Sequence, residues 1–395
     1  MQLKDAAILI KGARAFQFEK ITTQLTQKLH KTVLEINMKA LEKNYLAFSE
    51  LLKKSTKIMA MVKASAYGSG SVEIAKFLEY KKVDYLGVAY ADEGIELRNA
   101  GITTPILVLN PERAAYQDFI QYDLEPEIYS FHLLESFIHF CKKAGQKACF
   151  HLKLDSGMHR MGFEPYEIPK LLAILRKYKN DIQVKSIFSH LASSEAKKED
   201  DFTQSQFDVY LKMVQQIELI LPYKPIRHIL NTAGIIRFPQ YQLDMVRLGT
   251  GLYGIDSNVS IMKKLIPCVT LKSYISQIKP RKVGETVGYS RNGLITRPSK
   301  IAAVALGYAD GLPRKAGNVN YQLLVNNQLA PTVGNISMDI TLIDITDIEN
   351  VHIGDEVVVF GKYPPIQTLA IALETITYEI LTGVPQRVKR VYVHD

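Results

Sequence analysis

Short runs of β-branched and other apolar residues alternate with helical patterns between about residue 35 and about residue 250. Ser71–Tyr80, for example, has the apolar spacing of an amphipathic helix. This alternation predicts βαβ units and a parallel sheet. Eight such units in about 220 residues match the size of a (β/α)8 barrel, with an open doubly wound sheet as the alternative. The predicted strands are Lys57–Val62, Asp84–Ala89, Pro105–Leu109, Glu125–Tyr129, Cys149–Leu154, Val184–Ser189, Arg227–Leu230 and Leu243–Leu248.

The pattern changes after about Ile266, where helical spacing nearly vanishes and strand-like runs are separated by turn residues. We therefore expect a barrel over residues 31–265 and a second, mostly β domain over residues 266–395. Residues 1–30 form a separate extension, in which Ala6–Gly12 is a candidate strand. In the second domain the pattern predicts strands at Thr270–Ile278, Ile301–Leu306, Thr341–Ile345 and Glu356–Phe360, with one helix at Gln367–Glu374.

Composition narrows the function classes. Apolar residues make up 47% and charged residues 23% of the chain, as expected of a folded protein. The net charge of +9 comes from scattered lysines and arginines without a basic run, which argues for anionic small molecules rather than nucleic acid. The three cysteines show no metal or disulfide spacing, so we expect no metal site and a cytoplasmic location. No signal peptide or membrane-spanning stretch is predicted.

Unusual polar residues follow the predicted strands at their carboxyl ends, where barrel enzymes place catalysis. Lys63 ends an apolar strand, and a desolvated lysine there can act as an imine-forming nucleophile. Taken alone, it could equally be a strand-end lysine reaching solvent. The other residues at these ends are Tyr67, Lys153, Arg160, His190, Asn231, Thr232 and Arg247.

Two glycine-containing segments follow neighbouring strands, at Asn231–Gly234 and Arg247–Gly251. Each is a common turn sequence by itself. Together they predict one phosphate site in the position where barrels commonly hold phosphate. His190 has about equal claims to a structural and a functional role. Tyr289 and Tyr308 lie in turn-like segments of the β domain, where a tyrosine usually packs its ring against the protein and leaves its hydroxyl in solvent.

An ordered series of motifs resembles the alanine racemase family from about Thr32 to the end of the chain. This resemblance implies a pyridoxal 5′-phosphate (PLP) enzyme with a barrel followed by a β domain, which interconverts L- and D-alanine and supplies D-alanine for peptidoglycan. The matching segments are Val62–Gly70, Leu154–Gly162, Asn231–Gly234, Asp244–Gly254, Gly307–Gly311 and Val333–Asp339.

The resemblance also implies residue roles. Lys63 would bind PLP covalently and, with Tyr289, would form the acid/base pair that serves opposite faces of the substrate. Arg247 would face the pyridine nitrogen and contact His190, and the lysine matching Lys153 is often carbamylated in the family. The resemblance assigns the remaining cofactor residues as Tyr67, Asn231, Thr232, Gly249, Thr250 and Tyr378. It assigns the substrate site to Arg160, Met338, Tyr308 and Asp339.

The resemblance further implies a homodimer with shared active sites, because Tyr289, Tyr308, Met338 and Asp339 would reach the barrel of the other subunit. Ser65, Ser69 and Ser337 depart from the usual family residues, which leaves the breadth of substrate open. The alternatives are a broad-specificity racemase, a barrel-fold PLP decarboxylase and a non-catalytic PLP-binding protein. The decarboxylase ranks lower because such enzymes generally place a carboxylate at the position of Arg247.

The extension resembles the C-terminal end of the ligase that adds D-Ala-D-Ala to the muramyl tripeptide, through the run Ala7–Ala15. In some bacteria that ligase is fused ahead of an alanine racemase. We therefore predict that the chain is the racemase part of such a fusion, the alternative being a family-specific extension. An independent start codon with no ligase frame upstream would contradict the fusion.

Overall fold

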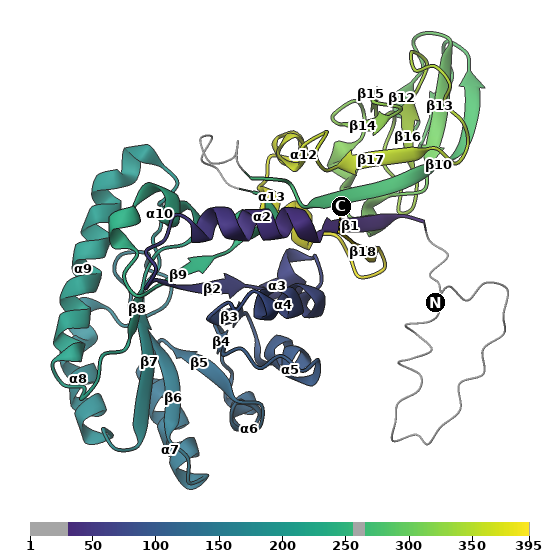
Figure 1. The fold of residues 1–395 in the computed structure, drawn as a ribbon. Coiled ribbons are helices and arrows are strands. Elements are labelled where there is room, and N and C mark those ends of the chain that lie inside the picture. Colours follow the sequence, from purple (N-terminus) through teal and green to yellow (C-terminus); the bar gives the residue numbers. More distant parts are fainter. Residues whose placement is uncertain (1–30, 256–264, 395) are drawn as a thin grey trace, which may run out of the picture.

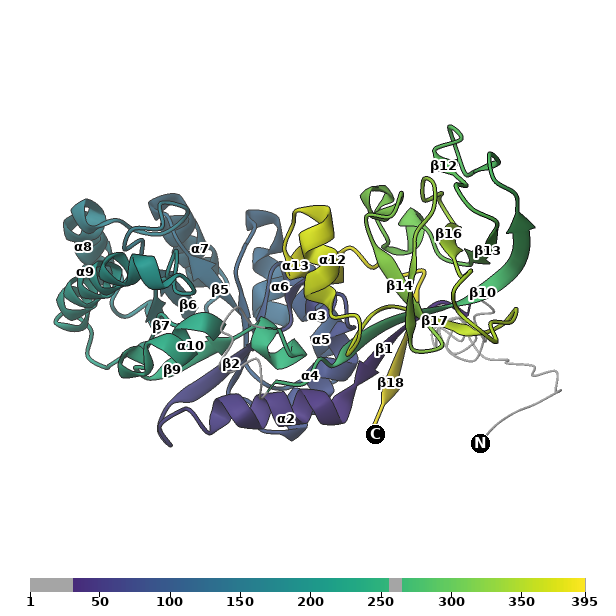
Figure 2. The same cartoon turned by 90° about the horizontal axis from the view of Figure 1, so that it is seen from above.

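The protein is described by a computed structural model that covers residues 31–255 and 265–394. The candidate strand at Ala6–Gly12 and the whole ligase-like run lie outside these described residues. A barrel and a mostly β domain lie side by side, and α12 (Ile366–Leu373) and α13 (Thr377–Thr382) project from the β domain toward the mouth of the barrel (Figures 1 and 2).

Eight parallel strands form the barrel in the order β8-β7-β6-β5-β4-β3-β2-β9. The backbone N–H groups of Asp244 and Arg247 donate to the carbonyls of Arg227 and Leu230, which brings the two end strands together. All eight predicted runs are strands. Because the two end strands meet, the sheet closes into a barrel and the open-sheet alternative is wrong. The strands are β2 (Lys57–Met61), β3 (Tyr85–Val88), β4 (Ile106–Val108), β5 (Leu124–Ile128), β6 (Ala148–Lys153), β7 (Ile182–Phe188), β8 (Ile226–His228) and β9 (Met245–Leu248).

Helices follow the barrel strands and cover the outside of the sheet (Figure 1). The predicted helix Ser71–Tyr80 has the predicted bounds and buries Ile74, Ala75 and Leu78. The helices of this half are α2 (Met38–Ser49), α3 (Lys63–Tyr67), α4 (Ser71–Tyr80), α5 (Ala91–Asn99), α6 (Tyr116–Gln121), α7 (Phe131–Lys143), α8 (Ile168–Lys177), α9 (Asp200–Glu218) and α10 (Thr232–Arg237). No helix in the described ranges is long and apolar enough to cross a membrane.

The second domain is built on one eight-stranded sheet, whose longest strand, β10, pairs with three neighbours, β1, β13 and β17. Six strands follow the order β15-β14-β17-β10-β1-β18, while β13 also pairs with β10 and β16 pairs with β13. The strands are β1 (Val33–Asn37), β10 (Val269–Arg281), β13 (Ser299–Val304), β14 (Gln322–Val325), β15 (Gln328–Pro331), β16 (Thr341–Asp344), β17 (Glu356–Phe360) and β18 (Lys389–Val393), with a separate hairpin of β11 (Thr286–Val287) and β12 (Gly293–Leu294).

Two details differ from the sequence-based expectation. The segment β1, which was assigned to the barrel, pairs with β10 and with β18 and so belongs to the β sheet. Buried and partly exposed side chains alternate along β1, as in a strand with one face on the core. Its hydrogen-bonding partners come from the C-terminal part of the chain. The helix α13 was not expected beside α12, because a six-residue segment is too short for a clear helical pattern.

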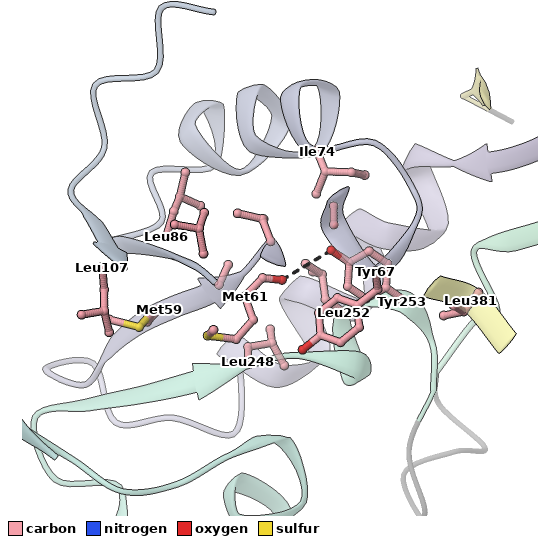
Figure 3. Packing of buried hydrophobic residues seen from close by; sticks show 14 of the residues in the cluster. Met59, Met61, Tyr67, Ile74, Leu86, Leu107, Leu248, Leu252, Tyr253 and Leu381 are labelled. Atoms are coloured by element: carbon pink, nitrogen blue, oxygen red, sulfur yellow. Dashed lines mark hydrogen bonds between the residues drawn. The ribbon is translucent and has the colours of Figure 1, made fainter. Parts of the chain in front are cut away.

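Apolar side chains from the barrel strands and from the loops above them form a continuous core (Figure 3). Met59 of β2 lies beside Leu107 of β4 (Figure 3), and Ala60 pairs with Leu86 of β3 and Leu248 of β9. Tyr253 donates a hydrogen bond to the carbonyl of Met61 at 3.5 Å. This packing fixes the carboxyl end of β2, and Lys63 follows two residues later.

Candidate active site

A cavity of about 900 Å³ lies at the carboxyl ends of the barrel strands and is closed on one side by α12 and α13. Eleven of the residues predicted from the sequence line it, although they come from segments spread over more than 300 positions. The predicted residues in the cavity wall are Lys63, Tyr67, Lys153, Arg160, His190, Asn231, Thr232, Arg247, Gly249, Thr250 and Tyr378.

The backbone after Lys63 makes a left-handed helical turn. Ala64, Ser65, Ala66 and Tyr67 all have φ between 50° and 54°, a conformation that costs roughly 1–2 kcal/mol per residue for residues with a Cβ. Four such residues in succession persist only where the surroundings impose them, as is common at functional sites. The turn therefore holds Lys63 in a fixed place at the mouth of the barrel.

Contacts from both domains hold this turn. The Glu93 carboxylate accepts a hydrogen bond from the N–H of Ala64 at 2.6 Å. From β18, the Arg390 guanidinium donates to the carbonyl of Gly68 at 2.8 Å and the Tyr392 hydroxyl donates to that of Ser69 at 2.9 Å. The β domain thus supports the segment that carries the candidate nucleophile.

The electrostatic surroundings of Lys63 favour its neutral form. Burial lowers the pKa of its amine, and the guanidinium groups of Arg160 and Arg247 act in the same direction, while Glu93 and Glu127 oppose them. A neutral amine is the nucleophilic form of lysine. The structure therefore provides the desolvated lysine that the sequence predicted.

Hydroxyl groups and a backbone N–H gather at one end of the cavity. Thr250 and Tyr378 share a hydrogen bond of 2.9 Å between their hydroxyls, and the N–H of Gly249 donates to the Thr232 hydroxyl at 2.9 Å. A Cβ on Gly249 would lie 3.0 Å from the Tyr67 hydroxyl, so glycine leaves that space open. Small donors around a bare backbone are suited to a phosphate group.

Arg247 lies on β9 and is 5% exposed. Its Nη2 donates to the carbonyls of Ser189 and Ile229 at 2.8 and 2.9 Å, and its Nη1 lies 2.7 Å from Nδ1 of His228. Burial lowers the pKa of Arg247 to about 10, so the guanidinium remains charged at neutral pH. Neutral hydrogen-bond acceptors therefore fix the direction in which the Arg247 guanidinium points.

His190 and Asn231 support this side of the cavity. Nδ1 of His190 lies 3.1 Å from Nη2 of Arg247, which is the contact that the family resemblance implied. Burial and the charge of Arg247 hold the pKa of His190 well below its usual value, so its imidazole is neutral and accepts this hydrogen bond. Asn231 accepts from the N–H of Gly234 and from the Ser194 hydroxyl, at 2.9 and 2.7 Å, and so caps α10.

Lys153 and Glu127 form a buried pair in the cavity wall, with 3.9 Å between Nζ and Oε1. The ammonium also lies over the ring of Phe188, 4.4 Å from its centroid. Burial lowers the pKa of Lys153 to about 8, although Glu127 opposes the shift. Burial in turn raises the pKa of Glu127 despite the nearby cations.

Arg160 is positioned by a tight loop after β6. The Asp155 carboxylate accepts hydrogen bonds from the N–H groups of Gly157, Met158 and Arg160, at 2.8 to 3.1 Å. Although burial acts to raise it, these hydrogen bonds hold the pKa of Asp155 below its usual value. At Gly162, φ is +127° and a Cβ would lie 2.6 Å from the backbone N of Asp155, so only glycine fits the loop.

Four predicted site residues lie outside the cavity of the same chain. Tyr289, Tyr308 and Met338 are 67%, 44% and 53% exposed, and Asp339 is also exposed. The N–H of Tyr308 donates to the carbonyl of Ser337, which places this segment beside Met338. These residues therefore need a second chain if they are to reach a barrel.

Sequence reasoning missed Glu127, Phe188 and His228. Glu127 lies in a strand that had been predicted, two positions after Glu125. Alternate positions of a barrel strand point inward, so two carboxylates with this spacing signal buried charge. The signal was present in the sequence but was not used.

The charged side chains that line the cavity are mainly cationic even without Lys63, since Lys153, Arg160 and Arg247 outnumber Glu127 and Glu195. Such a wall attracts small molecules with phosphate and carboxylate groups. A phosphorylated aldehyde fits the residues present, with its phosphate at the hydroxyl cluster and its carbonyl carbon at Lys63. Fold and site together are those of a barrel enzyme that would bind a phosphorylated aldehyde at its lysine.

Comparison with known families agrees with this class. Residues 36–257 match the family model "Alanine racemase, N-terminal domain", and residues 268–392 match "Alanine racemase, C-terminal domain". The chain belongs to the alanine racemase family, and it is a PLP-dependent isomerase. Alanine racemase 1 of Caldanaerobacter subterraneus subsp. tengcongensis is 33% identical over 92% of this chain and 95% of its own length, and alanine racemase of Helicobacter pylori is 35% identical over 91% and 98%.

Solved structures show the same likeness. The alanine racemase of Clostridium difficile 630 has a TM-score of 0.87 and 34% identity, over 93% of this chain and 97% of its own. A Bartonella henselae alanine racemase with covalently bound pyridoxal phosphate has a TM-score of 0.84 and 29% identity, over 92% and 99%. The arrangement of both domains is therefore that of solved family members.

Proposed function

We propose that this protein interconverts L-alanine and D-alanine by two-base racemisation and supplies D-alanine for peptidoglycan. The observation that carries the proposal is the cavity in which Lys63, Arg247 and the hydroxyl cluster converge. The similarity to alanine racemases over more than nine tenths of the chain supports alanine as the substrate. The three cysteines are unpaired, which supports a cytoplasmic location.

The cofactor would be held by groups already in place. Lys63 would bind PLP covalently, Arg247 would face the pyridine nitrogen, and the phosphate would lie against Tyr67, Thr232 and the backbone of Gly249. When bound, PLP withdraws electrons from the α-carbon and so makes its proton acidic. Because Arg247 has no acceptor to offer, it favours an unprotonated pyridine nitrogen, which limits this withdrawal and disfavours transamination.

Racemisation needs one acid/base group on each face of the α-carbon. Lys63 would supply one, because burial lowers the pKa of its amine and so makes the neutral, proton-accepting form more accessible than in an ordinary lysine. Tyr289 would supply the other from a second subunit, since it is 67% exposed and lies on the β domain. The active unit would therefore be a homodimer with two shared sites.

The substrate carboxylate would bind Arg160 of one subunit and the N–H of Met338 of the other. Tyr308 and Asp339 would line the entrance from the second subunit. The Arg387 guanidinium donates to the Asp339 carboxylate at 2.6 Å and to that of Asp310 at 2.7 Å, which holds this edge of the β domain in shape.

Lys153 is a candidate for carbamylation, because its pKa of about 8 leaves more neutral amine than an ordinary lysine has. We expect the holoenzyme under ¹³C-labelled CO2 to show a carbamate ¹³C signal that is lost in Lys153→Gln. At constant dissolved CO2, the signal should grow as pH rises through about 8, because the amine loses its proton there. A wild-type protein without this signal would contradict the modification and leave Lys153 as the ammonium partner of Glu127.

Two other PLP activities are separated from alanine racemisation by one assay. Purified holoenzyme should be incubated with L-alanine and other L-amino acids in deuterated water, followed by chiral analysis and mass measurement. We expect D-alanine with one deuterium at Cα as the main product. Comparable turnover of several amino acids would favour a broad-specificity racemase, loss of CO2 would favour a decarboxylase, and absence of any turnover would favour a non-catalytic PLP-binding protein.

A further inference from the structure

The barrel interior beneath the cavity contains a chain of buried polar side chains. Barrel interiors are usually filled by branched apolar residues. Here His228, Ser186 and His151, from three adjacent strands, are all 0% exposed, and Glu125 is 8% exposed. None of these four lines the cavity, so the proposed chemistry does not account for them.

Consecutive hydrogen bonds connect this chain to the cavity. Nδ1 of His228 lies 2.7 Å from Nη1 of Arg247, and Nε2 of His228 lies 2.8 Å from Oγ of Ser186. The same Oγ lies 2.6 Å from Nδ1 of His151, whose Nε2 lies 2.7 Å from Oε2 of Glu125. Four short contacts thus join the Arg247 guanidinium to the Glu125 carboxylate through His228, Ser186 and His151.

The direction of the chain follows from the donor inventory. A guanidinium can only donate, so Nδ1 of His228 must accept and its hydrogen must be on Nε2. Burial and Arg247 hold the pKa of His228 well below its usual value, in agreement with a neutral ring. Nε2 of His228 therefore donates to Ser186.

The remaining links are fixed in the same way. Within the described residues, the hydroxyl of Ser186 has the two histidines as its hydrogen-bond partners and no other. Because Ser186 is fully buried, its own hydrogen is satisfied only by donation to Nδ1 of His151. Nε2 of His151 then donates to Glu125, whose other oxygen lies 3.3 Å from Nζ of Lys185.

We propose that Ser186, His151 and Glu125 are positioning residues that orient Arg247 through His228 and fix the plane of its guanidinium against the cofactor ring. The inference rests on the proposed role of Arg247. The carboxylate at the far end polarises every donor in one direction, and neighbouring hydrogen bonds in a low-dielectric interior strengthen one another. None of the three touches the cavity, and the hydrogen bonds that connect them to it run through His228 and Arg247.

The first measurement is ¹⁵N and ¹H NMR of holoenzyme labelled at its histidines, with signals assigned from single His→Gln variants. We expect neutral rings with the hydrogen on Nε2 for both His151 and His228, and N–H signals protected from exchange. A hydrogen on Nδ1 of either ring would overturn the proposal. This result does not depend on whether alanine is the substrate.

The second measurement compares Ser186→Ala with Ser273→Ala, a matched loss of a buried, hydrogen-bonded serine in the β domain. We expect Ser186→Ala to shift the His228 N–H signal, change the absorbance of the bound cofactor and lower kcat about tenfold, as for the loss of outer partners of metal-binding histidines. KM for alanine should change little.

A third variant separates charge from hydrogen bonding, because Glu125→Gln keeps an acceptor oxygen but removes the negative charge. We expect its effect on kcat to be smaller than that of Ser186→Ala and in the same direction. If Ser186→Ala matches Ser273→Ala in kcat and in cofactor absorbance, the chain has only a structural role and the proposal fails. If the wild-type enzyme racemises no amino acid, the proposed function fails instead.

Discussion

Replacing Lys63 with alanine should abolish racemisation and the covalent binding of PLP, with activity falling by about 10⁴-fold or more because both the nucleophile and one acid/base group are lost. The fold should persist, since the Lys63 side chain is at the cavity surface and the turn after it is held by backbone contacts to Glu93 and Arg390. Activity is measured by chiral analysis of alanine, and cofactor attachment by the mass of the protein after borohydride reduction of the imine to a stable amine.

The matched control for this loss is Lys57→Ala, which removes an exposed lysine at the opposite end of the same strand. It should keep wild-type activity and cofactor. A Lys63→Ala protein that still carries covalent PLP would show that another lysine is the attachment site. Lys153 would then be the first candidate, because it also lines the cavity.

Replacing Tyr289 with phenylalanine should lower racemisation by about 10²- to 10⁴-fold, the range for losing one general acid/base group. Lys63 and the cofactor should be unaffected, because Tyr289 lies outside the cavity of its own chain. The absorbance of bound PLP should therefore remain. Deuterium exchange at Cα should continue for one enantiomer of alanine and be lost for the other.

Tyr166→Phe is the control for this variant, since it removes the hydroxyl of an exposed tyrosine on the barrel. It should behave as wild type. A Tyr289→Phe enzyme that racemises normally would mean that the second acid/base group lies elsewhere.

The sequence was sufficient to predict the barrel strands but not the short helix that closes the cavity. Each of the eight β-branched runs is followed by a helical pattern, and the change of pattern marks where a strand ends and a helix begins, as in β2 and α4. The six residues of α13 carry no such periodic pattern, yet they bring Tyr378 to the cavity. Their helical structure depends on contact with the barrel rather than on local sequence.

The candidate site divides in the same way. Arg247 lies at the end of β9, and Lys63 and Thr250 come two residues after β2 and β9, so their convergence could be predicted from the position of strand ends alone. The chain from Arg247 to Glu125 could not, because its members come from five different strands and become neighbours only when these strands pair and the barrel closes. The exposed position of Tyr289 likewise has no local cause, since its proposed partner is a second copy of the chain.

The central claim is that each active site combines Lys63 of one subunit with Tyr289 of the other. Co-expression of Lys63→Ala and Tyr289→Phe chains with two different tags allows the mixed dimer to be purified. Each variant alone should be inactive, but the mixed dimer contains one intact site and should show about half of wild-type activity, as two-fold symmetry requires. A mixed dimer as inactive as its parents would contradict the shared site.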